Sequence, residues 1–166
     1  MRFTKLLVAF AAAVAITACS ALAQGHPSCN RSTLRGDYAF QITGQILAPA
    51  PVAGLVAGVA LTHFDGEGKM TQVDHVVHAG VAPVEEWRPG DGPYYVNPDC
   101  TGYMILTPKP TDPADAGPSL QIEFVIGNGG NEIRDVVTSS PSSPKFSAAI
   151  TGTATKVYQP IEDRLW

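Results

Sequence analysis

Hydrophobic and polar side chains alternate along most of the chain after its first two dozen residues, in short runs separated by turn residues. In residues 36–44, Tyr38, Phe40 and Ile42 share one face of an extended strand, and small or polar residues occupy the other face. Residues 120–126 repeat the pattern, because Leu, Ile, Phe and Ile occupy the even positions. This period-two alternation is typical of β-strands with one buried face.

Clusters of Gly, Pro, Asn and Asp separate these runs, and they supply the positive φ angles that tight hairpins need. The pattern predicts an all-β chain of eight strands, at about residues 36–47, 54–64, 68–78, 92–97, 101–107, 119–127, 130–138 and 145–156. An eight-stranded antiparallel up-and-down barrel is the simplest closure, because it leaves no bare edge. A two-sheet β-sandwich is the alternative. Residues 83–93 and 108–118 are predicted to be the two longer loops.

The chain begins with the parts of an export signal in order. Two basic residues precede an apolar stretch over residues 6–16, and a small-x-small cleavage site follows at residues 21–23. We therefore expect residues 1–23 to be a signal peptide and residues 24–166 to be a single domain, secreted or periplasmic. Alternatively, the sequence Ile-Thr-Ala-Cys ending at Cys19 is similar to a lipoprotein box, which would anchor the protein through a lipid on Cys19. No other segment is long and apolar enough to predict a transmembrane helix.

Cleavage after residue 23 would make the domain more acidic. It removes two of the eleven Lys and Arg residues and none of the fifteen Asp and Glu residues, so the formal charge changes from −4 to −6. An acidic surface without a basic stripe argues against nucleic acid and against anionic lipid as partners.

The same cleavage leaves two of the three cysteines, Cys29 and Cys100. In an oxidising compartment we expect them to form a disulfide that ties the start of the domain to the turn at residues 97–102. A closed loop of about 70 residues corresponds to roughly 4 kcal/mol of stabilisation in the chain-entropy account. The alternatives are two free thiols or a metal pair, but two cysteines without a clustered His do not make a zinc site.

Three short strings connect the chain to a known kind of protein. Residues 34–40 read Leu-Arg-Gly-Asp-Tyr-Ala-Phe, residues 64–69 read Phe-Asp-Gly-Glu-Gly-Lys, and residues 95–102 read Tyr-Val-Asn-Pro-Asp-Cys-Thr-Gly. Together they resemble small secreted barrel proteins of bacteria and fungi, which look like calycin-type barrels related to allene oxide cyclases. The resemblance runs from about Cys29 to Thr155. It implies an eight-stranded barrel with an apolar lumen, cofactor-free handling of a hydrophobic small molecule, and often a homodimer or homotrimer.

The densest polar cluster in a predicted strand is Asp74, His75 and His78. Period-two geometry places Asp74 and His78 on one face and His75 on the other. His63 lies across the hairpin on the neighbouring predicted strand. Such a set can hold a metal or act as an acid/base pair. Alternatively, these histidines lie at the surface or at the barrel rim and are hydrogen-bonded to water. We expect no metal site and no cofactor.

Glu123 and Arg134 lie on two strands joined by a hairpin and are expected to face each other directly or diagonally. If they point outward, they form a surface ion pair worth at most about 1 kcal/mol. If they point inward, Glu123 would be a buried carboxyl suited to general acid or base chemistry. The candidate catalytic residues are therefore Glu123, His75 and Asp74.

Aromatic side chains are the candidate ligand contacts, because they suit a planar or lipid-like molecule in a barrel lumen. The candidates are Tyr38, Phe40, Phe64, Trp87, Tyr95 and Phe124. Most aromatic residues are expected in the core, and Trp87 is expected to act as a lid or to pack over one barrel end.

Three functions fit these observations. The first is a secreted barrel that binds a hydrophobic small molecule in its lumen. The second is a cofactor-free isomerase, cyclase or small-molecule tailoring enzyme on the same barrel. The third is an extracellular structural or interaction module. The chain has no P-loop, no Gly-x-Ser-x-Gly and no His-Glu-x-x-His, so the enzyme classes that carry these motifs are not indicated.

Overall fold

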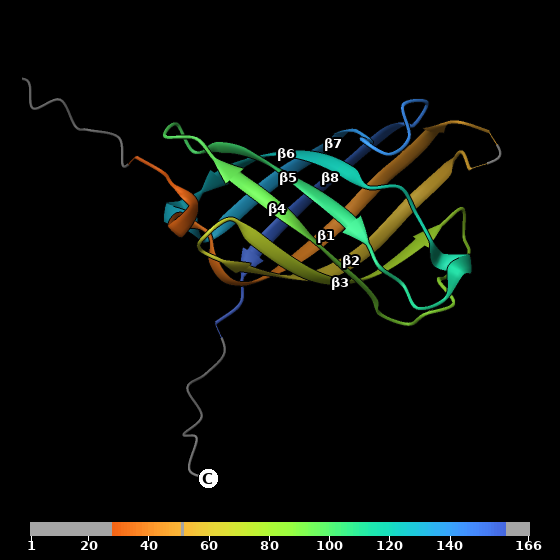
Figure 1. Ribbon diagram of the computed structural model, residues 1–166, viewed down its shortest axis with the longest axis horizontal. Helices are drawn as coiled ribbons and strands as arrows, with labels where there is room; N and C mark the ends of the chain where they lie inside the picture. The colour runs from red at the N-terminus through yellow and green to blue at the C-terminus, as the bar shows by residue number, and fades with distance from the viewer. Residues whose placement is uncertain (1–27, 51, 159–166) are drawn as a thin grey trace, which may run out of the picture.

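The protein is a closed barrel of eight antiparallel strands in sequence order, with the last strand paired to the first (Figure 1). The computed structural model describes residues 28–50 and 52–158. The strands are β1 (Arg35–Ala48), β2 (Gly54–Asp65), β3 (Lys69–His78), β4 (Arg88–Val96), β5 (Thr101–Pro108), β6 (Leu120–Gly127), β7 (Glu132–Ser139) and β8 (Ser147–Lys156). Three short 3-10 helices, η1 (Arg31–Thr33), η2 (Pro113–Asp115) and η3 (Asn128–Gly130), lie in the connections. The predicted up-and-down barrel is confirmed, and the sandwich alternative is wrong because a single sheet closes on itself.

Some of the sequence expectations lie outside the described residues. These are the expected signal peptide at residues 1–23, the alternative lipid anchor on Cys19 and the expected start of the domain at residue 24. Between residues 28 and 158, leaving aside residue 51, no helix has the length and apolar character needed to cross a bilayer.

The alternation in the sequence becomes the two faces of the barrel wall. Phe40 of β1 pairs with Ala60 of β2 on one side and with Ala154 of β8 on the other, and all three side chains are buried. One large residue between two small ones fills the narrow interior without overlap. Outward positions such as Leu61 and Val125 are exposed although they are apolar.

Strand β4 begins earlier than the sequence predicts. Its first residue, Arg88, lies in the segment 83–93 that we expected to be a loop, and it pairs with Asp74 of β3. The Pro and Gly residues here belong to a strand that approaches β5 very closely. A Cβ at Gly92 would lie 1.7 Å from the carbonyl oxygen of Ile105. The turn-like composition therefore allows close strand packing and does not form a turn.

One end of the barrel is filled by a set of side chains that we call the plug, consisting of Leu34, Tyr38, Phe64 and Tyr94. All four are fully buried, and the ring of Phe64 makes edge-to-face contacts with Tyr38 and Tyr94 at centroid distances of 5.3 and 5.0 Å. The Tyr38 hydroxyl donates a hydrogen bond to the carbonyl of Gly130, and the Tyr94 hydroxyl donates to the carbonyl of Leu34 at 3.1 Å. Each buried hydroxyl therefore has an acceptor, as a stable apolar plug requires.

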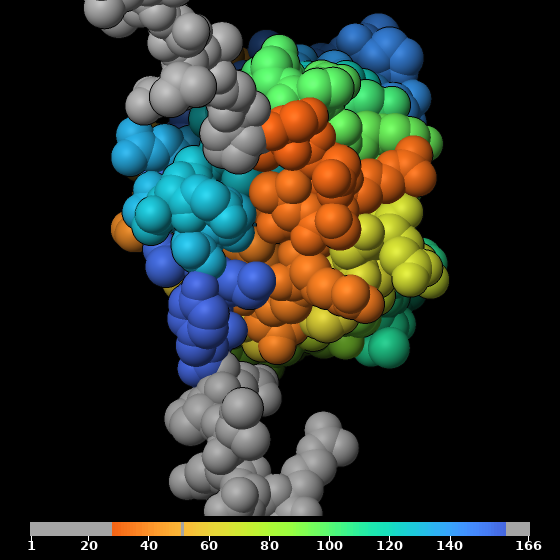
Figure 2. Space-filling view, turned by 90° about the vertical axis from the view of Figure 1, so that its left-hand side faces the viewer, coloured from red at the N-terminus to blue at the C-terminus, as the bar shows by residue number. Residues whose placement is uncertain are grey.

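The N-terminal segment covers the plug from outside. Cys29 forms a disulfide with Cys100, with Cα atoms 4.9 Å apart, and its backbone N–H donates to the carbonyl of Pro98 at 3.1 Å. The predicted disulfide is confirmed. Figure 2 shows this end of the molecule, with the orange N-terminal residues packed between the β2–β3 turn and the β6–β7 turn.

Candidate functional site

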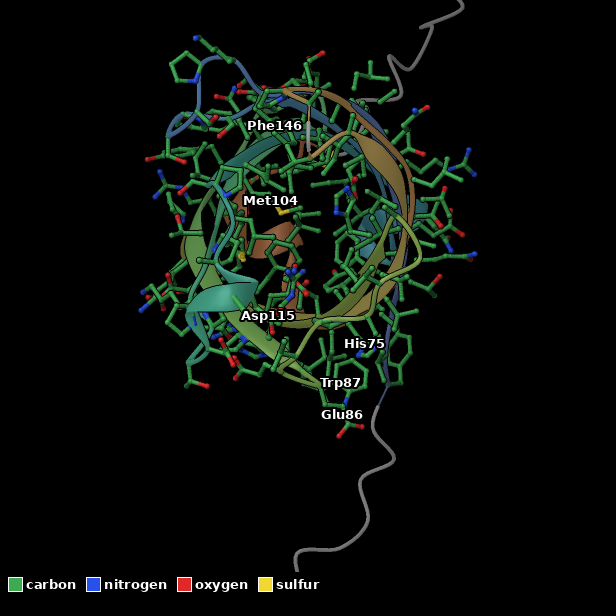
Figure 3. The ribbon with its side chains drawn as sticks, turned by 90° about the vertical axis from the view of Figure 1, so that its right-hand side faces the viewer. His75, Glu86, Trp87, Met104, Asp115 and Phe146 are labelled. Atoms are coloured by element: carbon green, nitrogen blue, oxygen red, sulfur yellow. A yellow bond between two sulfur atoms is a disulfide. The ribbon has the colours of Figure 1, made fainter. Side chains whose placement is uncertain are left out.

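The barrel holds a cavity of about 640 Å³ between the plug and the opposite end, which we call the mouth. The β1–β2, β3–β4, β5–β6 and β7–β8 connections surround the mouth. Figure 3 looks into this end, with Met104 inside the hollow and Phe146 at the rim. Most of the cavity wall consists of inward-facing apolar side chains: Phe40, Ile42, Ile46, Val56, Val76, Met104, Leu106, Leu120, Ile122, Val137, Phe146 and Ile150.

Hydrogen bonds tie two of the mouth connections together. The carboxylate of Asp115, at the end of η2, accepts the backbone N–H groups of Val84 at 3.0 Å and Glu85 at 2.6 Å. The Glu85 side chain in turn accepts the backbone N–H of Thr111 at 2.8 Å. The N–H of Glu85, followed by that of Val84, lowers the pKa of Asp115, so its carboxylate places a negative charge at the mouth.

A row of hydrogen-bonded polar side chains crosses β2, β3 and β4 inside the barrel. Thr62 donates to Gln72 at 2.9 Å, and Gln72 donates to Asp74 at 3.2 Å. The other oxygen of Asp74 accepts two bonds from the guanidinium of Arg88, at 2.9 and 2.7 Å. The positive charge of Arg88 therefore compensates the carboxylate of Asp74.

Asp135 of β7 is a second carboxyl in the cavity wall. Burial raises its pKa to about 6, and a hydrogen bond from the backbone N–H of Gly152 opposes that shift. The register pairs Asp135 with Gly152 of β8. A Cβ at Gly152 would lie 2.6 Å from one carboxylate oxygen, so the absence of a side chain there makes room for the acid.

His78 lines the cavity near the mouth end of β3. Its Nε2 atom is buried and has no hydrogen-bond partner among the described residues. A Cβ at Gly54 would lie 3.0 Å from that nitrogen, so the ring is packed against the start of β2. The expectation that Asp74 and His78 share one face and His75 the other agrees with the observed positions.

The three candidate catalytic residues are divided between the two faces of the wall. Asp74 lies inside the barrel, in the ion pair with Arg88. His75 lies outside, where its Nδ1 is 2.6 Å from the carbonyl oxygen of Glu86 and its ring is 6.0 Å from that of Trp87 (Figure 3). Neither His75 nor Glu123 lines the cavity.

Glu123 points outward, as one of the two alternatives has it, but the ion pairs of the described residues do not include the expected pair with Arg134. It accepts a hydrogen bond from the Gln121 amide at 2.8 Å and pairs in register with Val136, whereas Arg134 pairs with Val125. Glu123 and Arg134 are therefore diagonal neighbours. His63, the remaining histidine of the group, forms an outer pair with Asp37 at 2.7 Å.

Of the six aromatic residues proposed as ligand contacts, Phe40 alone lines the cavity. Tyr38 and Phe64 belong to the plug, and Phe124 is buried in the core. Trp87 and Tyr95 lie on the outer surface, and Tyr95 stacks on Tyr103 at a centroid distance of 4.7 Å. The aromatic residues therefore mainly fill the closed end, and aliphatic residues form most of the cavity wall.

Sequence reasoning missed three charged residues of the cavity, Asp135, Arg88 and Asp115. Asp135 alternates with Ile133 and Val137, and this pattern places it on the buried face of its strand. The inward position of Arg88 was not predicted, because the Pro- and Gly-rich composition of residues 83–93 indicates a loop and not a strand. Among residues 28–50 and 52–158, no three His, Cys, Asp or Glu side chains are grouped so that they could hold a metal ion.

Comparisons with protein-family models, with curated proteins and with solved structures gave no match.

Proposed function

We propose that this protein is exported and that it binds a hydrophobic small molecule in the barrel lumen, which the molecule enters through the mouth. The observation that carries the proposal is the cavity of about 640 Å³, which has an apolar wall, one closed end and one open end. Its volume is within the range of about 300–1,000 Å³ that is usual for small-molecule sites. The disulfide and the signal-like N-terminus support export, because disulfides persist in oxidising compartments. The resemblance to calycin-type barrels supports the same ligand class.

A pair of adjacent valines in β7 provides the test. Val137 lines the cavity and Val136 faces outward, with 7% and 40% of their surface exposed. The Val137→Phe substitution would place a ring inside the lumen, and Val136→Phe adds the same ring outside. Titration with the neutral dye Nile red should give one saturable site in the wild type. The affinity should fall by about tenfold in Val137→Phe, which is about 1.4 kcal/mol, and should be unchanged in Val136→Phe.

Thermal unfolding of both variants controls for loss of structure. The proposal fails if the wild type binds no dye, or if both phenylalanine variants bind it equally well.

Native mass spectrometry of the protein purified gently from its own host would provide an independent test, because a bound molecule adds a stoichiometric mass. The mass of the chain in the same spectrum distinguishes cleavage after residue 23 from lipidation at Cys19. The mass of the intact assembly gives the oligomeric state, for which we predict a homodimer or homotrimer.

A cofactor-free enzyme on the same barrel is the second candidate, and Asp135 is the observation that favours it. A carboxyl with a pKa near 6 in an apolar cavity suits general-base chemistry at neutral pH. If this candidate holds, a ligand recovered from the host preparation is converted on incubation with the wild type and not with Asp135→Asn, as followed by NMR and chromatographic retention, which also detect a product of unchanged mass. Recovery of an unchanged ligand from both proteins would contradict it.

A further inference from the structure

Asp135 differs from the other acid inside the barrel wall because no cation compensates it. The ion pairs within residues 28–50 and 52–158 are His63–Asp37, Arg88–Asp74 and Lys109–Asp91. Asp135 takes part in none of them, and the backbone N–H of Gly152 is the donor that reaches its carboxyl. A carboxylate in an apolar cavity with this single donor retains most of its hydrogen-bonding capacity for a molecule inside the lumen.

The strands on either side of Asp135 offer no charge in its vicinity. The inward residues of β6 and β8 that flank it are Phe124, its register partner, and Ile150. The inward cation of β8, Lys156, lies over the Tyr38 ring at 5.9 Å, at the plug end. Gly152 leaves open the space that a side chain would otherwise take.

The titratable groups elsewhere in the cavity wall also leave the lumen short of positive charge. Arg88 is bound to Asp74, and Asp115 adds a carboxylate at the mouth. His78 is the remaining titratable side chain of the wall. The electrostatic environment therefore favours a ligand that brings a cation and disfavours one that brings a carboxylate.

We propose that Asp135 is the recognition group of the lumen and that the ligand is a hydrophobic amine, whose ammonium group binds the Asp135 carboxylate while its apolar body fills the cavity. This inference rests on the proposed binding function and specifies its ligand class. An ammonium group can donate three hydrogen bonds and compensates the buried charge, whereas an alcohol donates one and leaves the charge in place.

Three probes with one ring system test the inference: 1-naphthylmethylamine, 1-naphthalenemethanol and 1-naphthoate. Calorimetric titration of the wild type at pH 7.5 should give the order amine, then alcohol, then carboxylate. The Asp135→Asn variant should lose amine affinity by on the order of 10- to 100-fold, as expected for a charge-assisted hydrogen bond, and should bind the alcohol almost unchanged. Glu123→Gln removes the same charge from the outer face of β6 and should leave all three affinities unchanged.

A pH series on the wild type tests the same inference without a substitution at Asp135. Because the pKa of Asp135 is about 6 and the amine stays protonated, lowering the pH from 7.5 to 5 should weaken amine binding by about tenfold. Alcohol binding should stay constant, since it does not depend on the charge. The same series on His78→Asn should keep the tenfold change, which separates Asp135 from the imidazole of the lumen.

The results distinguish the two proposals. If Nile red binds in a Val137-dependent manner but the amine has no advantage over the alcohol, the amine inference fails and the binding function stands. Equal or tighter binding of the carboxylate, or equal losses of amine and alcohol in Asp135→Asn, would also overturn the inference. If neither the dye nor any naphthalene probe binds, both proposals fail.

Discussion

The half-buried carboxyl of Asp135 should make the stability of the protein depend on pH in the direction opposite to that of most acids. Its pKa is about 6 in the folded chain, against 3.8 for an ordinary Asp. Between these values the folded state binds more protons than the unfolded state, so the stability falls as the pH rises. Above about pH 7 the fall is complete, and the pKa difference corresponds to a cost of about 3 kcal/mol.

The Asp135→Asn variant removes this cost and keeps the size of the side chain. Urea unfolding of the wild type and the variant at pH 4.5 and pH 7.5 measures the difference in free energy of unfolding at each pH. From the two pKa values, the advantage of the variant should grow by about 2 kcal/mol between these pH values. The comparison within one pH removes the titrations that the two proteins share.

Asp99 provides a control in which a carboxylate is removed without this pH dependence. Its pKa is lowered, first by the hydrogen bond from the Thr101 hydroxyl and then by the backbone N–H of Thr101, so the Asp99 carboxylate stabilises the fold above its ordinary pKa. Asp99→Asn changes the net charge as Asp135→Asn does, but its stability relative to the wild type should be almost the same at pH 4.5 and pH 7.5, because the pKa of Asp99 lies below this range in both the folded and the unfolded chain. The reasoning would be refuted if the advantage of Asp135→Asn were independent of pH, or if it shrank as the pH rose.

Three further predictions concern the plug, its disulfide and the glycine beside the lumen acid. Tyr94→Phe removes the hydroxyl that donates to the carbonyls of Arg31 and Leu34, so it should lower the free energy of unfolding by about 1–2 kcal/mol in urea unfolding. The matched control Tyr95→Phe, on the outer face, should change that free energy little. Replacing both Cys29 and Cys100 with Ser opens a loop with a sequence separation of 71 and should lower the free energy of unfolding by roughly 4 kcal/mol. A loss below about 1 kcal/mol in the same urea assay would contradict the entropic account. Gly152→Ala would place a methyl group 2.6 Å from a carboxylate oxygen and should lower the melting temperature, and an unchanged melting temperature would show that the carboxyl can move aside.

The fold was predictable because the alternation of residue types is strict where one strand face is buried. Phe40 and Ile122 lie inside, as their even positions in an alternating run indicate, and the disulfide followed from the cysteine count and the expected compartment. The start of β4 was not predictable from composition, because Gly92 serves a close strand approach that no local pattern reveals.

The site was less predictable than the fold. A period of two separates two faces but does not say which of them points inward when both carry polar residues, as around Asp74 and His75. Glu123 is the more conspicuous acid in the sequence because Arg134 lies across the hairpin from it, yet the inward parity belongs to Asp135. The aromatic residues suggested a ligand site, but Tyr38 and Phe64 fill the plug at one end of the barrel.

The plug also determines how the lumen exchanges its contents. Because Leu34 and its neighbours fill one end, the described residues leave the proposed ligand the mouth as its route for loading and release, past the connections joined by Asp115. A crosslink between the β3–β4 and β5–β6 connections would therefore slow association and dissociation by the same factor, provided that it leaves the cavity wall unchanged. Residence time and affinity would then be independent quantities in this protein, the first determined by the mouth and the second by the wall.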